Sequence, residues 1–147
     1  MLSPSSPLRE RTRERINARY EAFLAAGYPL ADFAPETIQC RNELDRTNWI
    51  ELRDMCRKAV ADELAFYQAM DLPIPDVPGD YPLPAPGIRC TSNNYIAPTV
   101  AQTLTILDLM RDWAKAAQEN WWALKDAAQA APTRDALQSI DLEEGWP

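Results

Sequence analysis

The proline-rich segment PIPDVPGDYPLPAPG, residues 73–87, constrains this chain more than any other stretch, because it holds six of the thirteen prolines. Proline fixes the backbone angle φ and removes a hydrogen-bond donor, so the segment cannot form a helix or a central strand. We expect a stiff, extended connector between the apolar patterns on either side. The alternative is a ligand for a proline-binding groove, since such grooves accept a preformed polyproline helix.

The residues before the connector predict a long helix that ends near Met70. Its N-cap is either Asn42 or Asp45, because both side chains can accept a hydrogen bond from the first helical turn. Apolar residues recur every three or four positions and form one broad stripe, which is typical of a helix that packs on one face. Cys56 lies on this stripe, so we expect it to be a buried thiol and not a nucleophile.

A longer helix is predicted for residues 99–131, between Pro98 and Pro132. Its apolar residues step by three and four with hardly a break, as in a packing seam. A second apolar line flanks the first and contains Ile106, Leu109 and Trp113. The helix should therefore bury more than one face, against its own chain or against copies of itself.

Two adjacent tryptophans, Trp121 and Trp122, point about 100° apart around this helix. We expect Trp121 to pack in the core and Trp122 to contact a partner, because aromatic residues are enriched at protein interfaces. The predicted interface candidates are Ile106, Leu109, Trp113 and Trp122.

A first helix is predicted to begin near Pro7 and to end at Gly27, residue types that suit these two positions. Arginine and glutamate crowd residues 9–15. Arginine at a helix start opposes the helix dipole, so packing or a partner would have to stabilise this segment. The alternative is a solvated face with Glu–Arg pairs one turn apart.

Three short strands are expected at residues 37–41, 88–91 and 94–96. Asn93 and Asn94 can adopt the left-handed conformation of a tight turn, so the last two strands should form a hairpin. If all three strands share one sheet, that sheet would brace one end of the long helices.

These elements predict an α+β fold that is mainly α: a preceding helix, then two long antiparallel helices braced by the small sheet and hairpin. At 147 residues the chain fits one domain with an arm. We expect an N-terminal arm and helix at residues 1–35, and a helical domain at residues 36–147 that the connector interrupts.

Composition excludes several classes of function. The net charge of −7 argues against nucleic acid as a partner, because neutralising phosphates takes an excess of Lys and Arg. The sequence has no run of about 18 apolar residues, and no apolar core follows the charges at its start. We therefore expect no membrane span and no signal peptide, and synthesis in the cytoplasm.

The chain has three cysteines and no histidine, so the common catalytic triads cannot be assembled, and a zinc site would need four thiolates or added carboxylates. We expect no catalytic, cofactor-binding or metal-binding residues; a small enzyme with Cys40 or Cys90 as nucleophile is a rival hypothesis. These two cysteines occupy similar positions in TIQCRN and GIRCTS. Neighbouring strands would bring them within disulfide reach, although reduced thiols are expected in the cytoplasm.

Two blocks of the sequence resemble a known family. One is DRTNW at residues 45–49, and the other is the closing ALQSIDLEEGW at residues 136–146. With the first helix and the hairpin, they resemble an uncharacterised domain family of tailed bacteriophages that is found in tail-fibre-type proteins. The resemblance covers about residues 14–147 and brings no known catalytic or ligand-binding residues.

The resemblance implies a structural component of the virion, associated with the tail, the tail fibre or the baseplate side. Its partners would be other phage tail or fibre proteins and further copies of the chain, with a trimer expected from the symmetry of phage appendages. The protein would be made in the host cytoplasm and located in the virion. The alternative is a transient tail-fibre assembly chaperone that is not retained in the virion.

Overall fold

The computed structural model describes residues 1–147 and places them in two compact units. Unit 1 contains Met1–Ala26 and Asp112–Pro147, and unit 2 contains Gly27–Arg111. About 58% of the residues are helical, and the strands form two small antiparallel sheets, which confirms the α+β, mainly helical class. The expected boundary between residues 35 and 36 differs from this division, because the first helix packs against the C-terminal end of the chain.

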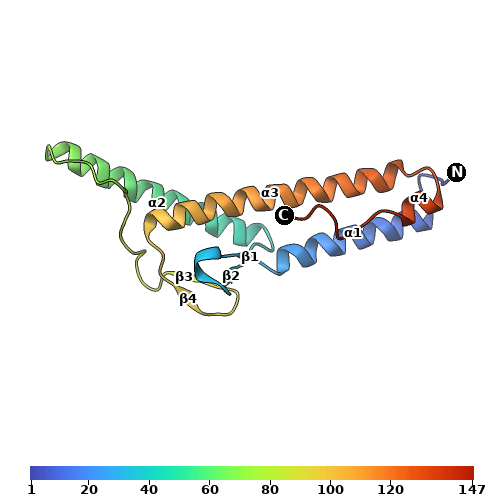
Figure 1. Cartoon of the computed structure of the whole chain (residues 1–147), viewed down its shortest axis with the longest axis horizontal. Helices are drawn as coiled ribbons and strands as arrows, with labels where there is room; N and C mark the ends of the chain where they lie inside the picture. Colours follow the sequence, from blue (N-terminus) through green and yellow to red (C-terminus); the bar gives the residue numbers. More distant parts are fainter. The chain divides into compact units, whose positions relative to one another are not determined.

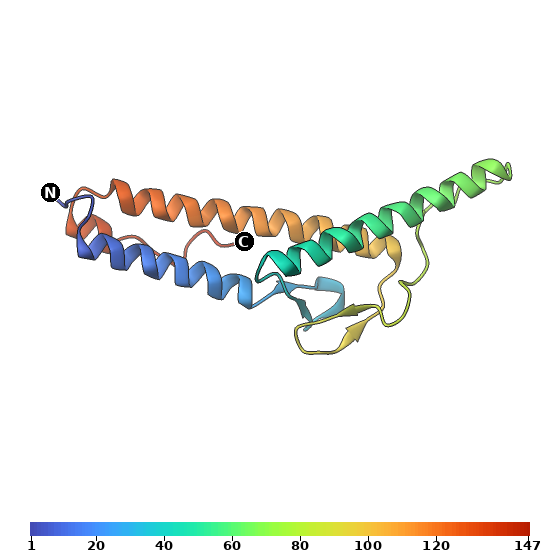
Figure 2. The ribbon, with the colours of Figure 1, turned by 180° about the vertical axis from the view of Figure 1, so that it is seen from behind.

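Unit 1 is built from helix α1 (Pro7–Ala25), the later part of α3 (Val100–Ala130) and the short α4 (Arg134–Gln138). Figure 1, and Figure 2 from behind, show α1 lying alongside the later part of α3. The side chains of Ser6 and Thr133 cap α1 and α4 by accepting a hydrogen bond from the third helical residue. The core between these helices consists of Ile16, Leu124, Ala128, Ala131 and Leu137.

Arg9 is buried in unit 1, and its guanidinium holds the end of α3. Nη1 donates to the carbonyls of Ala128 and Gln129 at 2.6 and 2.7 Å, and Nη2 donates to Ala131 at 3.1 Å. The last carbonyls of a helix have no partner within it and carry the negative end of its dipole. The charge run at residues 9–15 is therefore not simply a solvated face, because Arg9 satisfies these carbonyls.

The C-terminal Trp146 folds back onto α1. Its ring stacks on Tyr20 and Phe23, with ring centroids 6.1 and 5.2 Å apart. Its Nε1 donates to the carbonyl of Leu142 at 2.8 Å. These contacts fix the closing segment of the sequence against α1.

Unit 2 contains two separate hairpins. Strand β1 (Tyr28–Pro29) pairs antiparallel with β2 (Thr37–Ile38), and the 3-10 helix η1 (Ala31–Phe33) lies between them in the chain. Strand β3 (Ile88–Arg89) pairs antiparallel with β4 (Tyr95–Ile96), which confirms the predicted hairpin. The single sheet of three strands was wrong, because β2 pairs with β1 and not with the later hairpin.

The two hairpins are nevertheless tied together by hydrogen bonds. The backbone N–H and the hydroxyl of Thr91 donate to the carbonyl of Thr37 at 2.8 and 3.1 Å. The Glu36 carboxylate accepts hydrogen bonds from Ser92 and Asn94, and these bonds hold the pKa of Glu36 below its usual value. Side chains and one backbone pair therefore make the connection that a shared sheet was expected to make.

Helix α2 (Glu43–Ala69) begins at Asn42, whose side chain accepts from the N–H of Asp45 at 3.0 Å. Cys56 is the one fully buried residue of this 27-residue helix. Along the predicted apolar stripe, Trp49, Leu52, Val60, Leu64 and Tyr67 are partly buried, whereas Met55 is exposed. In both views the C-terminal end of α2 extends beyond the hairpins and the start of α3 (Figures 1 and 2). Much of α2 therefore meets solvent.

The connector returns from the end of α2 to the start of α3. The N–H of Gly79 donates to the Glu63 carboxylate at 2.7 Å, and its carbonyl accepts from Ala101 at 3.0 Å. Further along, the N–H of Leu83 donates to the carbonyl of Pro98 at 3.0 Å. The second half of the segment is thus anchored on both sides, as a connector requires.

Helix α2 ends in a left-handed residue that is not glycine. The N–H of Leu72 donates to Tyr67 at 2.9 Å and the N–H of Asp71 to Gln68 at 3.2 Å, the two bonds of a Schellman motif. Asp71 has a φ of 52°, a conformation that costs an L-residue free energy and glycine almost none.

The variant Asp71→Gly is therefore expected to raise the free energy of unfolding by about 0.5–1 kcal/mol. Urea titration followed by circular dichroism would measure the change. The control is Asp76→Gly, since Asp76 is exposed and has no positive φ, and this variant should be neutral or destabilising. An Asp71→Gly protein no more stable than the parent would contradict the argument.

Candidate assembly surface

Two of the predicted interface residues, Trp113 and Trp122, lie in unit 1 and have different surroundings. Trp113 stacks on Phe23 with ring centroids 4.8 Å apart, so its own chain already covers much of it. Trp122 is 50% exposed. Its neighbour Trp121 stacks on Tyr20 at 4.7 Å and donates to Asn17 at 2.9 Å. Of the tryptophans in α3, Trp122 is the one left available to a partner.

The other two predicted residues, Ile106 and Leu109, lie in unit 2 and line a shallow groove beside η1. The groove has a volume of about 260 Å³ and is lined on its other side by Leu30 and Phe33. Leu109 is 53% exposed, whereas Ile106 is partly buried. The structure therefore leaves Leu109 of unit 2 and Trp122 of unit 1 exposed.

Further exposed apolar side chains lie on α2 and on the residues that directly follow it. Eight large hydrophobic side chains between residues 44 and 77 are at least 46% exposed. We call them the α2 surface: Leu44, Ile50, Met55, Phe66, Met70, Leu72, Ile74 and Val77. Three of them, Leu44, Met55 and Phe66, lie almost in one line along α2, and neighbouring exposed apolar side chains mark sites of protein interaction. Of these three, Leu44 and Met55 belong to the predicted apolar stripe and Phe66 does not.

The charges around the α2 surface are unevenly placed. From Ala59 to Ile88 the sequence contains no Lys or Arg but has five acidic residues. Asp62 pairs with Lys58 one turn earlier at 2.5 Å, and both side chains are exposed, so this pair adds little stability. The end of the α2 surface is thus apolar and acidic.

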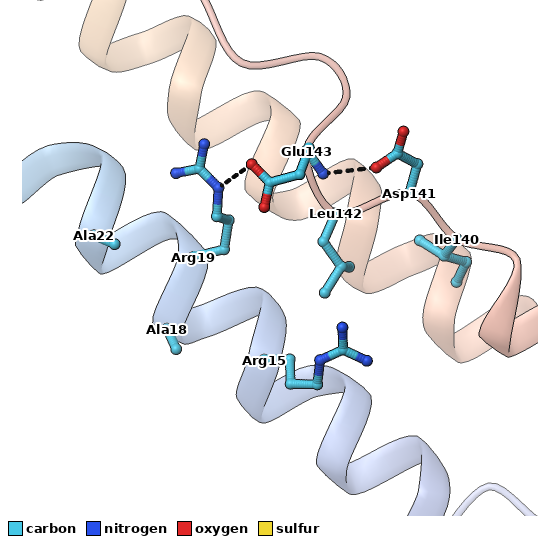
Figure 3. Close-up of a pocket in the computed structure, with 8 residues that line it drawn as sticks. All are labelled: Arg15, Ala18, Arg19, Ala22, Ile140, Asp141, Leu142 and Glu143. Carbon is cyan, nitrogen blue, oxygen red and sulfur yellow. Dashed lines mark hydrogen bonds and ion pairs between the residues drawn. The ribbon is translucent and has the colours of Figure 1, made fainter.

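Unit 1 has an open pocket of about 520 Å³ between α1 and residues 140–143, shown in Figure 3. Arg19 Nε donates to the Glu143 carboxylate at 2.8 Å, and the N–H of Glu143 donates to Asp141 at 2.9 Å. Arg15 also lines the pocket, so two cations and two carboxylates balance one another. This arrangement fastens the C-terminal segment to α1.

All three cysteines are free and buried. Burial raises the pKa of each thiol, and at Cys90 the neighbouring Glu36 raises it further. A reactive cysteine needs a lowered pKa, so the geometry does not favour a nucleophile at Cys40 or Cys90. The structure contains no disulfide between these two residues, which follow strands of different sheets.

We therefore expect a thiol-specific reagent at pH 7 to modify the native protein slowly at all three cysteines. Each unit by which a thiol pKa rises lowers the thiolate fraction about tenfold at a given pH, and burial restricts access further. Mass spectrometry of the labelled protein would follow the reaction, with urea-unfolded protein as the fast control. A single cysteine that reacted in the native state as fast as in urea would revive the nucleophile hypothesis.

No group of three or more His, Cys, Asp and Glu side chains is placed to hold a metal ion. None of the helices combines the length and the apolar character needed to cross a membrane. Comparisons with protein-family models, with curated proteins and with solved structures found no match.

Proposed function

We propose that this protein is a structural component that assembles through protein–protein contacts in a bacteriophage tail or tail fibre. The observation that supports such contacts is the α2 surface. Leu44, Met55 and Phe66 are 67%, 51% and 56% exposed. Full burial of such a side chain stabilises a protein by about 1.5–3 kcal/mol, so a partner that covers these residues would recover a large part of that free energy.

The phage setting comes from the resemblance of residues 45–49 and 136–146. In the first block, Asp45 accepts from the backbone and side chain of Arg41, and Trp49 Nε1 donates to the carbonyl of Gln39 at 2.6 Å. These contacts fix the start of α2.

The second block likewise holds the fold. Trp146 packs on α1, and Gly145 has a φ of 87° with Asn120 so close that a Cβ atom would lie 2.3 Å from its side-chain oxygen. The residues that carry the resemblance therefore maintain the fold, which supports the proposal of a structural role.

The proposed partners are other tail or fibre proteins and further copies of this chain. The α2 surface is the main contact, and the exposed Leu109 and Trp122 are secondary candidates. The location follows from the proposal: synthesis in the host cytoplasm and incorporation into the virion.

Quantitative mass spectrometry of purified phage particles tests this proposal. We expect the protein in a fixed ratio to a tail or fibre protein. The matched control is the lysate from which the particles were purified. A protein abundant in the lysate, bound there to a fibre subunit and missing from particles, would contradict the virion role and would instead support the transient chaperone.

A further inference from the structure

We infer that α2 pairs with the α2 helix of a second copy in antiparallel orientation, with a two-fold axis passing near Met55. The inference rests on the proposed function and deepens it, because it names the partner that covers the α2 surface. It draws on the spacing of three exposed side chains and on the charges that lie between them.

The three side chains with regular spacing are Leu44, Met55 and Phe66, each eleven residues from the next. Eleven residues make about three helical turns plus 20°, so the three lie almost in line along the helix over about 33 Å. All three are more than half exposed. Cys56, about 100° further around the helix from Met55, is 1% exposed. The line therefore lies beside the buried face of α2 and is open to solvent.

Equal spacing makes this line complementary to itself. A two-fold axis beside Met55 places Met55 against the Met55 of the second copy. It also places Leu44 against Phe66 and Phe66 against Leu44. Such an isologous contact uses the same patch on both copies and closes on itself. The three apolar contacts would then be made at regular intervals along both helices.

The charges on the line select the antiparallel orientation. Glu51 lies on the line between Leu44 and Met55, and Asp62 lies between Met55 and Phe66. In two parallel helices in register, Glu51 would face Glu51 of the second copy and Asp62 would face Asp62. The like charges of these carboxylates would repel each other.

An antiparallel pair removes both of these repulsions. About the Met55 axis, Asp62 comes to face Asn48, whose amide can donate to the carboxylate. Glu51 faces Ala59 of the second copy. The next residue, Leu52, faces Lys58 of the second copy, so the Lys58 ammonium lies near the Glu51 carboxylate and has the complementary charge. The partner that this pattern fits is therefore a second copy in antiparallel orientation. A two-fold contact differs from the trimer expected from the sequence, in which the copies around the axis would run parallel.

Disulfide crosslinking with single added cysteines tests this arrangement in the full chain. The variants are Met55→Cys, Leu44→Cys and Phe66→Cys, and the wild type is the control because its own thiols are buried. Met55→Cys should crosslink to itself under mild oxidation. Leu44→Cys and Phe66→Cys should each stay uncrosslinked alone and should form a mixed dimer when combined. Circular dichroism verifies that each variant keeps the helix content of the parent.

Three results would overturn the inference. Efficient crosslinking of Leu44→Cys alone and of Phe66→Cys alone would mean parallel helices. An oligomeric native mass without crosslinks in any variant would move the contact to another surface while leaving the proposed function intact. A monomeric native mass without crosslinks would rule out self-association, and the proposed function would then rest on contacts with other proteins alone.

Discussion

Replacing Arg9 by alanine is expected to lower the free energy of unfolding by about 3–5 kcal/mol, as the loss of one partner in a buried polar arrangement does. Arg9 is 4% exposed, and its guanidinium donates to the carbonyls of Ala128, Gln129 and Ala131. Alanine would leave these carbonyls buried without donors at the negative end of α3. It would also remove the bonds by which Arg9 holds the backbone of Leu2 and Ser3.

Thermal unfolding followed by circular dichroism would measure this effect. The matched control is Arg13→Ala on the same helix, where the side chain is exposed and the change should stay within about 0.5 kcal/mol. The loss of stability in Arg9→Lys should lie between the losses in Arg9→Ala and Arg13→Ala, because one ammonium cannot reproduce the planar fork of a guanidinium. Equal stability of the Arg9→Ala and Arg13→Ala proteins would show that the α3 carbonyls do not depend on Arg9.

Gly87→Ala is expected to destabilise unit 2 by about 3 kcal/mol or more, because strain and a backbone clash act together. Gly87 has a φ of 85°, and a Cβ atom there would lie 2.1 Å from the carbonyl oxygen of Ile96. Ile96 pairs with Ile88 in the β3–β4 hairpin, so it cannot move away without breaking that pair.

Urea unfolding and the labelling rate of Cys90, which directly follows β3, would both report the loss. The matched control is Gly79→Ala, where φ is 82° but the nearest atom is a Val60 methyl carbon at 3.1 Å, at the end of a side chain. In Gly79→Ala the free energy of unfolding should fall only by the cost of the left-handed conformation, about 1–2 kcal/mol. Equal losses in the two variants would mean that the contact with Ile96 contributes nothing.

The helices could be predicted from the sequence because the signals that begin and end them are local. Thr99 accepts from the N–H of Gln102 at 3.0 Å, and the Gln102 side chain accepts from the N–H of Thr99 at 2.8 Å. This capping box lies within four residues of sequence. Gly27, with a φ of 85°, ends α1 where its position predicted.

The β3–β4 hairpin was predicted from its turn residues, but the pairing of β2 with β1 could not be predicted, because each of these strands contains two residues and carries no alternating pattern. Pro29 in β1 even argues against a strand. The role of Arg9 was hidden for a different reason. Its acceptor Ala128 is 119 residues away in the sequence, and nothing local distinguishes Arg9 from Arg11 or Arg13.

The candidate surface was predicted only in part. The pattern correctly separated Trp121, which packs, from Trp122, which is exposed. It also placed Trp113 on an outward line, but Phe23 covers it. The apolar stripe of α2 was evident and is mostly half-buried, but the pattern did not include the exposed Ile50 and Phe66.

The solution mass of the pure protein tests most directly whether a second copy of the chain covers the α2 surface. Sedimentation equilibrium should give a mass above the 16.6 kDa of one chain for the wild type. Met55→Lys should reduce it to a single chain, whereas Tyr95→Lys should not, although Tyr95 is equally exposed at 54%. A wild type that remains at 16.6 kDa at every concentration would contradict the account.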